Sequence, residues 1–428
     1  MEVVVKILLI YFIVISILMV VYSCRHYLFT YNRMFARQKI SYRDIFDSEL
    51  PKVSVLVPMH NEELVIENAL NALIRCDYDR DKLEIIGIDD HSSDRTGEIL
   101  DSYCEKYDFI RALHRQDENQ LRGKPAGLND ALEIANGDVI IVFDADYRPS
   151  VNLIRKLVNA FADPQVGAVM GRVVPINANT NTLTTLLNLE RTGGYQVDQQ
   201  ARYNLGLIAQ YGGTVGGFRK DLIMKNGGFN TKVLAEDTEL TFRLYTQGYT
   251  VVYDNSAECY EESPETWPVR GKQVRRWSRG HNEVLFRYFG RVIVSRYLNI
   301  RQKIDGILLL MVYMVPFLLL LAIVDSMVLF FMGRVGELRF WWLFLMVGFF
   351  NSWGNFAPYY EISAGAIIDG LRKEVYALPM LGFSFYFYMF YTVAGFFEAI
   401  ADSITSRNVT WDKTKRFEKA SPAPKPAG

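Results

Sequence analysis

The chain has 428 residues, half of them hydrophobic, and a formal net charge of −1. A nearly neutral chain lacks the broad basic field of nucleic-acid-binding proteins, so nucleic acid is not expected as a partner. The four cysteines form no CxxC pair and have no histidines at zinc-finger spacing, so we expect reduced thiols and no structural zinc. The length is sufficient for one catalytic domain of about 250 residues and several membrane spans.

The first segment is apolar from residue 3 to residue 22, interrupted only by Lys6, and is long enough to cross a bilayer. The sequence Cys24-Arg25-His26 that follows offers no small-residue cleavage site, so residues 1–24 are predicted to be a retained transmembrane helix and not a signal peptide. Residues 25–50 are predicted to be a cytoplasmic linker, because they contain the basic residues Arg25, Arg33, Arg37, Lys39 and Arg43. We therefore expect a multi-pass plasma-membrane protein with its catalytic domain on the cytoplasmic side.

Residues 51–260 are predicted to form an α/β domain with a mostly parallel sheet, because short β-branched runs alternate with amphipathic segments. Strands are predicted at 53–57, 83–88 and 138–143, and helices at 62–75, 96–107 and 126–135. Ligands of such sheets bind beyond the carboxyl ends of the strands. The residues after these three strands are therefore the first place to look for a site.

Polar residues follow each predicted strand. The segments are 58–62 with Pro58, His60 and Glu62, 89–94 with Asp89 and Asp90, and 144–146 with Asp144 and Asp146. One such cluster alone could merely cap the next helix, as Ser93 and Asp94 could. Three clusters at successive strand ends favour a shared ligand site.

Asp144-Ala145-Asp146 is the candidate metal site. In extended chain, residues two apart point the same way, so both carboxylates can face one Mg²⁺ or Mn²⁺. Such an ion would neutralise charge that develops on a diphosphate leaving group. An Asp-x-Asp triplet also recurs by chance. Lys124 supplies a cation for phosphate or for the edge of the nucleobase, with an exposed loop lysine as the alternative.

These motifs resemble family 2 glycosyltransferases of the GT-A fold, in particular the processive membrane synthases of cellulose, chitin, hyaluronan and poly-N-acetylglucosamine. The resemblance covers residues 52–280. In that family, segments like 58–62, 89–92 and 144–146 hold the nucleotide diphosphate, and Gly123, Lys124, Leu128 and Asn129 match a further element. The resemblance implies a GT-A domain fused to transmembrane helices and a UDP-sugar donor.

Two later motifs specify the subgroup. Leu234-Ala235-Glu236-Asp237 is similar to the family's Thr-Glu-Asp, whose aspartate is the catalytic base, and residues 273–277 match the Gln-x-x-Arg-Trp of processive members. Ala235 departs from the usual threonine. His60 stands where many members carry a tyrosine near the uracil, so an imidazole would replace the phenol ring as stacking partner.

The resemblance implies a role for each site residue. Asp237 would be the catalytic base, and Asp146 with Asp144 would bind Mg²⁺ or Mn²⁺. The nucleotide-sugar would contact Pro58, His60, Glu62, Asp89, Asp90, Lys124, Asp144 and Arg276. The acceptor would contact Gly213, Thr214, Glu236, Gln273 and Trp277. For the segment 212–218 a glycine-rich turn is the alternative, and for Trp277 a membrane anchor is the alternative.

The C-terminal part is predicted to be membrane-associated. Amphipathic interface helices are expected at 261–303. About three spans are expected within 304–402, at 307–324, 340–359 and 378–399. A tail is expected at 403–428, with its last residues, 420–428, disordered. Three late spans would place the C-terminus outside, yet basic residues follow the last one. The number of spans is therefore open, with a re-entrant or interfacial segment as the alternative.

The predicted activity is processive, inverting transfer from UDP-N-acetylglucosamine or UDP-glucose to a growing polysaccharide, coupled to export, with an accessory export subunit as a further candidate partner. The first alternative is a single transfer to a polyprenyl phosphate or glycolipid. The second is a non-catalytic membrane sensor or polysaccharide-binding protein. The presence of Asp144, Asp146, Asp237 and Arg276 together disfavours it, because a binding module needs no base.

Overall fold

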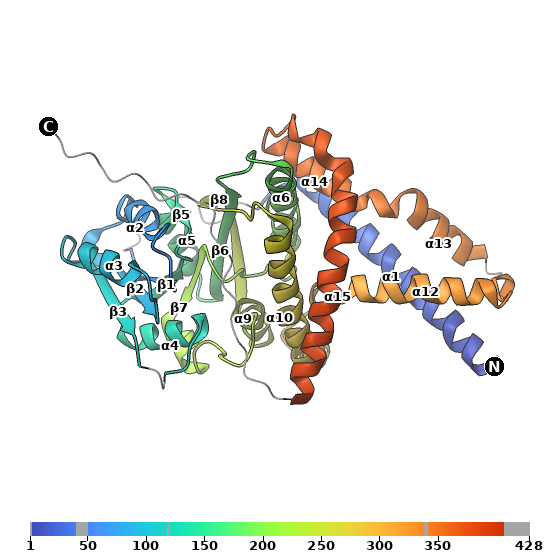
Figure 1. The fold of residues 1–428 in the computed structure, drawn as a ribbon, viewed down its shortest axis with the longest axis horizontal. Helices are drawn as coiled ribbons and strands as arrows, with labels where there is room; N and C mark the ends of the chain where they lie inside the picture. Colours follow the sequence, from blue (N-terminus) through green and yellow to red (C-terminus); the bar gives the residue numbers. More distant parts are fainter. Residues whose placement is uncertain (1, 40–49, 118–119, 338–340, 406–428) are drawn as a thin grey trace.

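The computed structural model describes residues 2–39, 50–117, 120–337 and 341–405. Its centre is an eight-stranded sheet in the order β3-β2-β1-β4-β7-β6-β8-β5. The strands are β1 Val53–Met59, β2 Leu83–Asp90, β3 Ile110–Arg115, β4 Val139–Val142, β5 Arg148–Pro149, β6 Val166–Pro175, β7 Gly216–Arg219 and β8 Thr250–Glu261. Figure 1 shows this sheet on one side of the molecule, with long helices on the other.

The predicted parallel sheet is present in the first half of the domain. β1 pairs in parallel with β2 and β4, and β2 with β3, whereas β7 runs antiparallel to both β4 and β6. The register sets Met59 opposite Asp89 and so brings the carboxyl ends of β1 and β2 to one edge. β1 and β4 are almost continuously apolar and buried, as expected for strands covered on both faces.

The helices of the domain follow or connect these strands along the chain. They are α2 Ile66–Ile74, α3 Thr96–Cys104, α4 Lys124–Ile134, α5 Leu153–Asn159, α6 Thr182–Thr192, the π-helix η3 Gly193–Gln199, α7 Gln200–Leu205, α8 Lys220–Lys225 and α9 Glu236–Thr246. The predicted interface region contains one long helix, α10 Trp267–Val294, which packs along α15 Leu381–Thr405. α10 therefore joins the sheet domain to the C-terminal helices.

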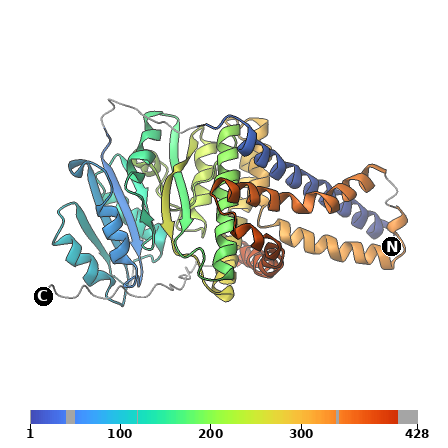
Figure 2. The same ribbon diagram turned by 90° about the horizontal axis from the view of Figure 1, so that it is seen from above.

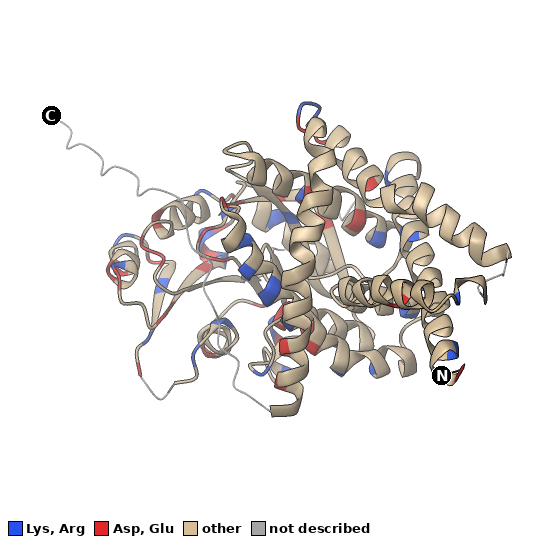
Figure 3. Cartoon of the chain, turned by 45° about the vertical axis from the view of Figure 1, so that its right-hand side comes forward, with Lys and Arg blue, Asp and Glu red and all other residues tan. Residues whose placement is uncertain are grey.

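Two runs among the described residues are long and apolar enough to cross a membrane, namely α1 Glu2–Phe35 and residues 374–405. α11 Ile300–Met311 and α12 Val315–Phe331 would add a third if they form one span, although a bend of 74° separates them. α1, α12 and α13 Trp341–Ser352 extend away from the sheet, with the N-terminus at the far end (Figures 1 and 2). Charged residues are few along these projecting helices in Figure 3.

The segment predicted as one span at 340–359 is not one continuous helix. α13 ends at Ser352, a 3₁₀ turn follows at Gly354–Phe356, and α14 begins at Ala357 and ends at Ile368. The break packs on α1, where the Tyr27 hydroxyl donates to the carbonyl of Trp353 at 2.7 Å. A Cβ on Gly354 would lie 2.6 Å from Ser23 Oγ. Apolar composition alone did not reveal this break.

Some predicted boundaries also differ or lie outside the described residues. α1 continues to Phe35, well beyond the expected end at residue 24. Residues 40–49 of the predicted linker, including Arg43, lie outside the described part of the chain, as do most of the predicted tail and the basic residues that follow the last span.

A closed ring of four ion pairs fastens α1 to the domain. Arg25 Nη2 lies 3.1 Å from Asp198 Oδ2, and Arg25 Nε lies 3.0 Å from Asp305 Oδ1. Arg202 completes the ring by pairing with the other oxygens of Asp198 and Asp305. Both guanidinium groups also lie over the ring of Phe29. Because buried charges need such compensation, these segments depend on one another.

Candidate active site

A cavity of about 860 Å³ lies beyond the carboxyl ends of β1, β2 and β4 and reaches α10, α11 and α1. All predicted site residues except Asp89 line it. They are Pro58, His60, Glu62, Asp90, Lys124, Asp144, Asp146, Gly213, Thr214, Glu236, Asp237, Gln273, Arg276 and Trp277. Residues from widely separated parts of the chain therefore share one cavity.

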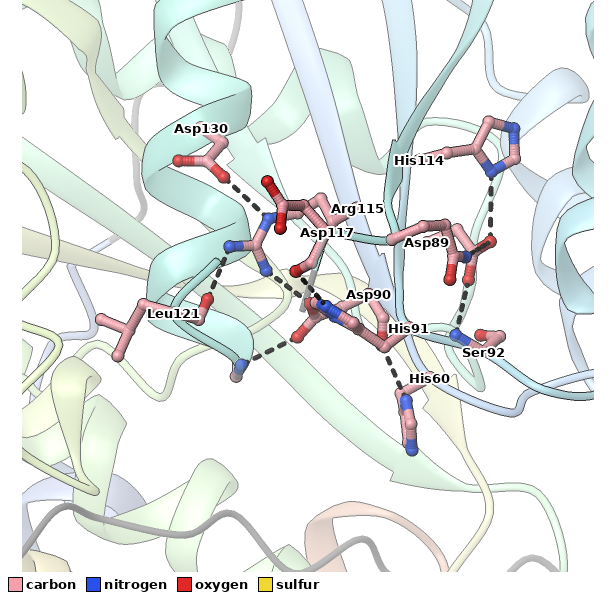
Figure 4. Close-up of polar contacts among 12 residues, drawn as sticks. His60, Asp89, Asp90, His91, Ser92, His114, Arg115, Asp117, Leu121 and Asp130 are labelled. Carbon is pink, nitrogen blue, oxygen red and sulfur yellow. Dashed lines mark hydrogen bonds and ion pairs between the residues drawn. The ribbon is translucent and has the colours of Figure 1, made fainter. Parts of the chain in front are cut away.

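Asp89 faces away from this cavity, and the structure does not bring it to the predicted nucleotide site. Its carboxylate lies 3.1 Å from His114 Nδ1 and accepts from Ser92 N–H at 3.3 Å (Figure 4). Successive residues of a strand point to opposite faces, so only one of Asp89 and Asp90 can face the ligand. Asp90 is the one that lines the cavity.

The loops that follow β1 and β2 interlock. Asn61 Oδ1 accepts from Ser93 N–H at 2.7 Å, and Asn61 N–H donates to Ser92 Oγ at 2.9 Å. His60 Nδ1 lies 2.7 Å from the carbonyl oxygen of Asp90. These bonds hold His60 and Asp90 together at one end of the cavity.

Lys124 lines the cavity. Its ammonium lies 2.7 Å from Asp144 Oδ1, 2.9 Å from the carbonyl oxygen of Gly213 and 3.7 Å from Glu236 Oε1. Burial lowers the pKa of Lys124, but Asp144 and Glu236 outweigh it and leave the pKa above its ordinary value. The alternative of an exposed loop lysine is wrong, because only 14% of the side chain is exposed.

Asp144 and Asp146 fit a metal ion that arrives with a phosphate ligand. Both line the cavity, and within the described ranges no cluster of three or more His, Cys, Asp or Glu side chains could hold a metal. Asp144 and Asp146 would supply one or two carboxylates to an ion that also binds substrate phosphate. This is how Mg²⁺ is usually held beside substrate phosphates.

Asp237 lies in the first turn of α9, where its Oδ1 accepts from Thr238 N–H at 2.6 Å. Gly213 approaches its other oxygen, since a Cβ on Gly213 would lie 3.2 Å from Asp237 Oδ2. Gly213 has φ +78°, a conformation that favours glycine. The glycine-rich segment therefore borders the predicted base and continues into β7, so it is more than a turn between strands.

His281 is a cavity residue that the sequence analysis missed. Its Nε2 lies 3.2 Å from Thr238 Oγ1, and its ring centroid lies 4.7 Å from that of Tyr313. Burial lowers the pKa of His281, with Asp237 opposing the shift. Helical spacing could have found it, because His281 follows Trp277 by four residues and Gln273 by eight on α10.

Trp277 points inward and not toward an apolar surface. The guanidinium carbons of Arg270 and Arg191 lie 4.9 Å and 5.6 Å from its ring centroid. Arg270 also donates to Gln273 Oε1 at 2.8 Å and to Glu190 Oε2 at 2.9 Å. The membrane-anchor interpretation of Trp277 is therefore not supported.

Glu236 makes the stability of the folded protein depend on pH. Burial raises its pKa to about 7, with Lys124 opposing the shift. The folded state therefore holds a proton that the unfolded chain releases near pH 4.5. The associated stability, on the order of 3 kcal/mol, is fully present below pH 4.5 and is lost as the pH rises through about 7. The melting temperature of the wild type should therefore fall between pH 5 and 8, and Glu236→Gln should weaken this fall. Equal slopes of melting temperature against pH in wild type and variant would contradict the prediction.

The family model described as glycosyl transferase family 2 matches residues 54–224. The probable glycosyltransferase YdaM of Bacillus subtilis is 33% identical over 405 residues, which are 92% of each chain. A β-monoglucosyldiacylglycerol synthase of Trichormus variabilis is 30% identical over 66% of this chain and 60% of its own length. A poly-β-1,6-N-acetyl-D-glucosamine synthase of Staphylococcus aureus is 30% identical over 58% of both.

The fold also matches a solved structure. The mannosyltransferase PcManGT of Pyrobaculum calidifontis, in complex with GDP-Man and Mn²⁺, has a TM-score of 0.60 and 21% identity over 91% of this chain and 99% of its own. This likeness supports the predicted GT-A-like α/β fold. The sequence relatives carry the family assignment and confirm the prediction of a glycosyltransferase.

Proposed function

Because the chain belongs to glycosyl transferase family 2, we propose that it transfers sugar from a UDP-sugar to a saccharide with inversion, and that it does so repeatedly to build a polysaccharide. One observation carries this proposal. Asp144 and Asp146, Asp237, and Trp277 come from three distant segments and line one cavity. Asp144 and Asp146 would hold the ion that binds the diphosphate, Asp237 would be the catalytic base, and Trp277 would contact the acceptor.

The cavity supports a single displacement. Asp237 Oδ2, beside Gly213, takes the proton from an acceptor hydroxyl as its oxygen attacks the anomeric carbon. The bond between that carbon and the diphosphate breaks on the opposite face. Lys124 and Arg276, which both line the cavity, stabilise the charge of the departing diphosphate. One displacement converts an α-linked donor into a β-linked product.

Asp146, with Asp144, would hold the proposed Mg²⁺ or Mn²⁺. When bound, such an ion neutralises charge on the diphosphate. Asp144 also pairs with the Lys124 ammonium at 2.7 Å.

The acceptor end supports a location at the plasma membrane. The cavity is also lined by Tyr22 and His26 of α1 and by Leu308 of α11, which belong to the apolar helices. A polymer that leaves Trp277 would thus lie next to these helices, as coupling of synthesis to export requires. The match of residues 273–277 to the processive motif favours repeated transfer.

Single transfer to a glycolipid is the second candidate. It is favoured by the similarity to β-monoglucosyldiacylglycerol synthase over two thirds of this chain. The same apolar helices beside the cavity would suit an acceptor held in a bilayer. The two candidates share the donor site and differ only in the acceptor.

Product length separates the two candidates. The full chain in nanodiscs, with Mg²⁺ or Mn²⁺, is incubated with a panel of labelled UDP-sugars, with and without diacylglycerol or polyprenyl phosphate. We expect UDP release and products of many sugars that linkage-specific β-glycosidases digest. Products with one added sugar, formed only with a lipid acceptor, would refute processivity, whereas no turnover with any UDP-sugar would refute the donor assignment.

A further inference from the structure

Arg115, at the end of edge strand β3, is a buried cation outside the predicted site. Only 2% of its surface is exposed. Its guanidinium donates in three directions: from Nη1 to Asp90 Oδ1 at 2.5 Å, from Nε to Asp130 Oδ2 at 2.7 Å and from Nη2 to the carbonyl of Leu121 at 2.6 Å (Figure 4). A buried guanidinium needs acceptors for its fork of donors, and here they come from three separate segments.

Two of these segments lead to opposite ends of the donor site. Asp90 faces the cavity beside His60, which the family resemblance places near the uracil. Leu121 begins the short segment 121–124 that ends in Lys124, at the end assigned to the diphosphate. The segment is tied a second time, because Gly123 N–H donates to Asp90 Oδ2 at 2.8 Å. Gly123 reaches that oxygen with φ +109°, which favours glycine.

The cluster leaves Asp90 with a fixed direction. Oδ1 is shared by Arg115 and by His91 Nδ1, which lies 2.8 Å away, and Oδ2 faces Gly123. Movement of Asp90 would therefore displace segment 121–124, and movement of that segment would displace Asp90.

We propose that Arg115 is a positioning residue. It couples Asp90, at the uracil end of the donor site, to Lys124, at the diphosphate end, so that the two ends cannot move independently. This inference rests on the proposed function for the identity of the nucleotide. Arg115 is not in the cavity lining, yet the coupling role makes binding of the diphosphate depend on it. A purely structural role would not.

Arg111 provides a matched control on the same strand. Its side chain is 44% exposed and pairs with Glu84 at 3.2 Å, away from the cavity lining. Arg111→Met removes the same charge from β3 without touching Asp90 or segment 121–124. Arg115→Lys keeps a charge beside Asp90, but one ammonium cannot hold all three acceptors.

The test measures dissociation constants for UDP and UMP by titration calorimetry, using the full chain in nanodiscs with Mn²⁺. We expect Arg115→Lys to weaken UDP binding about tenfold and UMP binding by less than about threefold, because the loop that positions Lys124 is released. Arg115→Met should weaken both ligands, and Arg111→Met neither. Melting temperatures of each variant, measured in parallel, show whether it is folded.

The inference would be overturned if folded Arg115→Lys had the wild-type ratio of dissociation constants for UMP and UDP. It would also be overturned if Arg111→Met changed that ratio as much as Arg115→Lys does. If wild-type protein binds neither nucleotide, the proposed function fails as well. If wild type binds UDP and only the ratio is unaffected, the proposed function survives and the coupling role of Arg115 does not.

Discussion

Asp237→Asn is expected to lower the turnover number by about 10²–10⁴-fold, because an amide cannot take the proton of the attacking hydroxyl. Affinity for UDP should change little, since Asp237 acts on the acceptor hydroxyl and the amide has nearly the same shape as the carboxylate. Release of UDP, followed continuously, gives the rate, and calorimetry gives the affinity.

Asp254→Asn is the matched control for this variant. Asp254 is a buried carboxylate on β8 that accepts from Ser256 N–H at 2.9 Å and does not line the cavity. Its replacement should leave turnover near the wild-type value. An Asp237→Asn protein that retained a tenth or more of wild-type turnover would remove Asp237 from the role of base.

Lys124→Met is expected to lower kcat/KM by about 10²–10³-fold through loss of a cation beside the diphosphate. The same change leaves Asp144 and Glu236 without their shared partner, so repulsion of the donor adds to the loss. Affinity for UDP should fall with kcat/KM, and Lys124→Arg should restore part of it. Steady-state kinetics with varied donor, together with calorimetry, measure both effects.

Lys220 provides the comparison for Lys124. It is likewise the first residue of a helix, α8, and its ammonium donates to the carbonyl of Ala135 at the opposite end of the sheet. Lys220→Met should affect stability more than kcat/KM. If Lys124→Met bound UDP as tightly as wild type, the assignment of Lys124 to the diphosphate would be wrong.

The ends of strands β1, β2 and β4 could be predicted because alternation of strand and helix places successive carboxyl ends on one edge. The same logic could not choose between Asp89 and Asp90, since the choice depends on which face of β2 meets the ligand. β3 escaped prediction because Arg111, His114 and Arg115 interrupt its apolar pattern at the sheet edge.

Contacts between distant segments account for most of the remaining differences. The break near Trp353 follows from packing against Tyr27 and Ser23 of α1, which hydropathy does not register. The role of Arg115 depends on acceptors that come from three segments. His281 could have been found by extending the helical spacing of Gln273 and Trp277, which shows that a known motif can be followed along its helix.

The ring of Arg25, Asp198, Arg202 and Asp305 bears on how this enzyme can be handled in the laboratory. A truncated protein that starts at Pro51 would lose Arg25, so two acids would share one guanidinium in a buried setting, and the cavity would lose the wall formed by Tyr22 and His26. Removal of one partner of a buried ion pair is strongly destabilising. α1 and the sheet domain thus depend on one another, and a protein without α1 would lack part of the cavity lining.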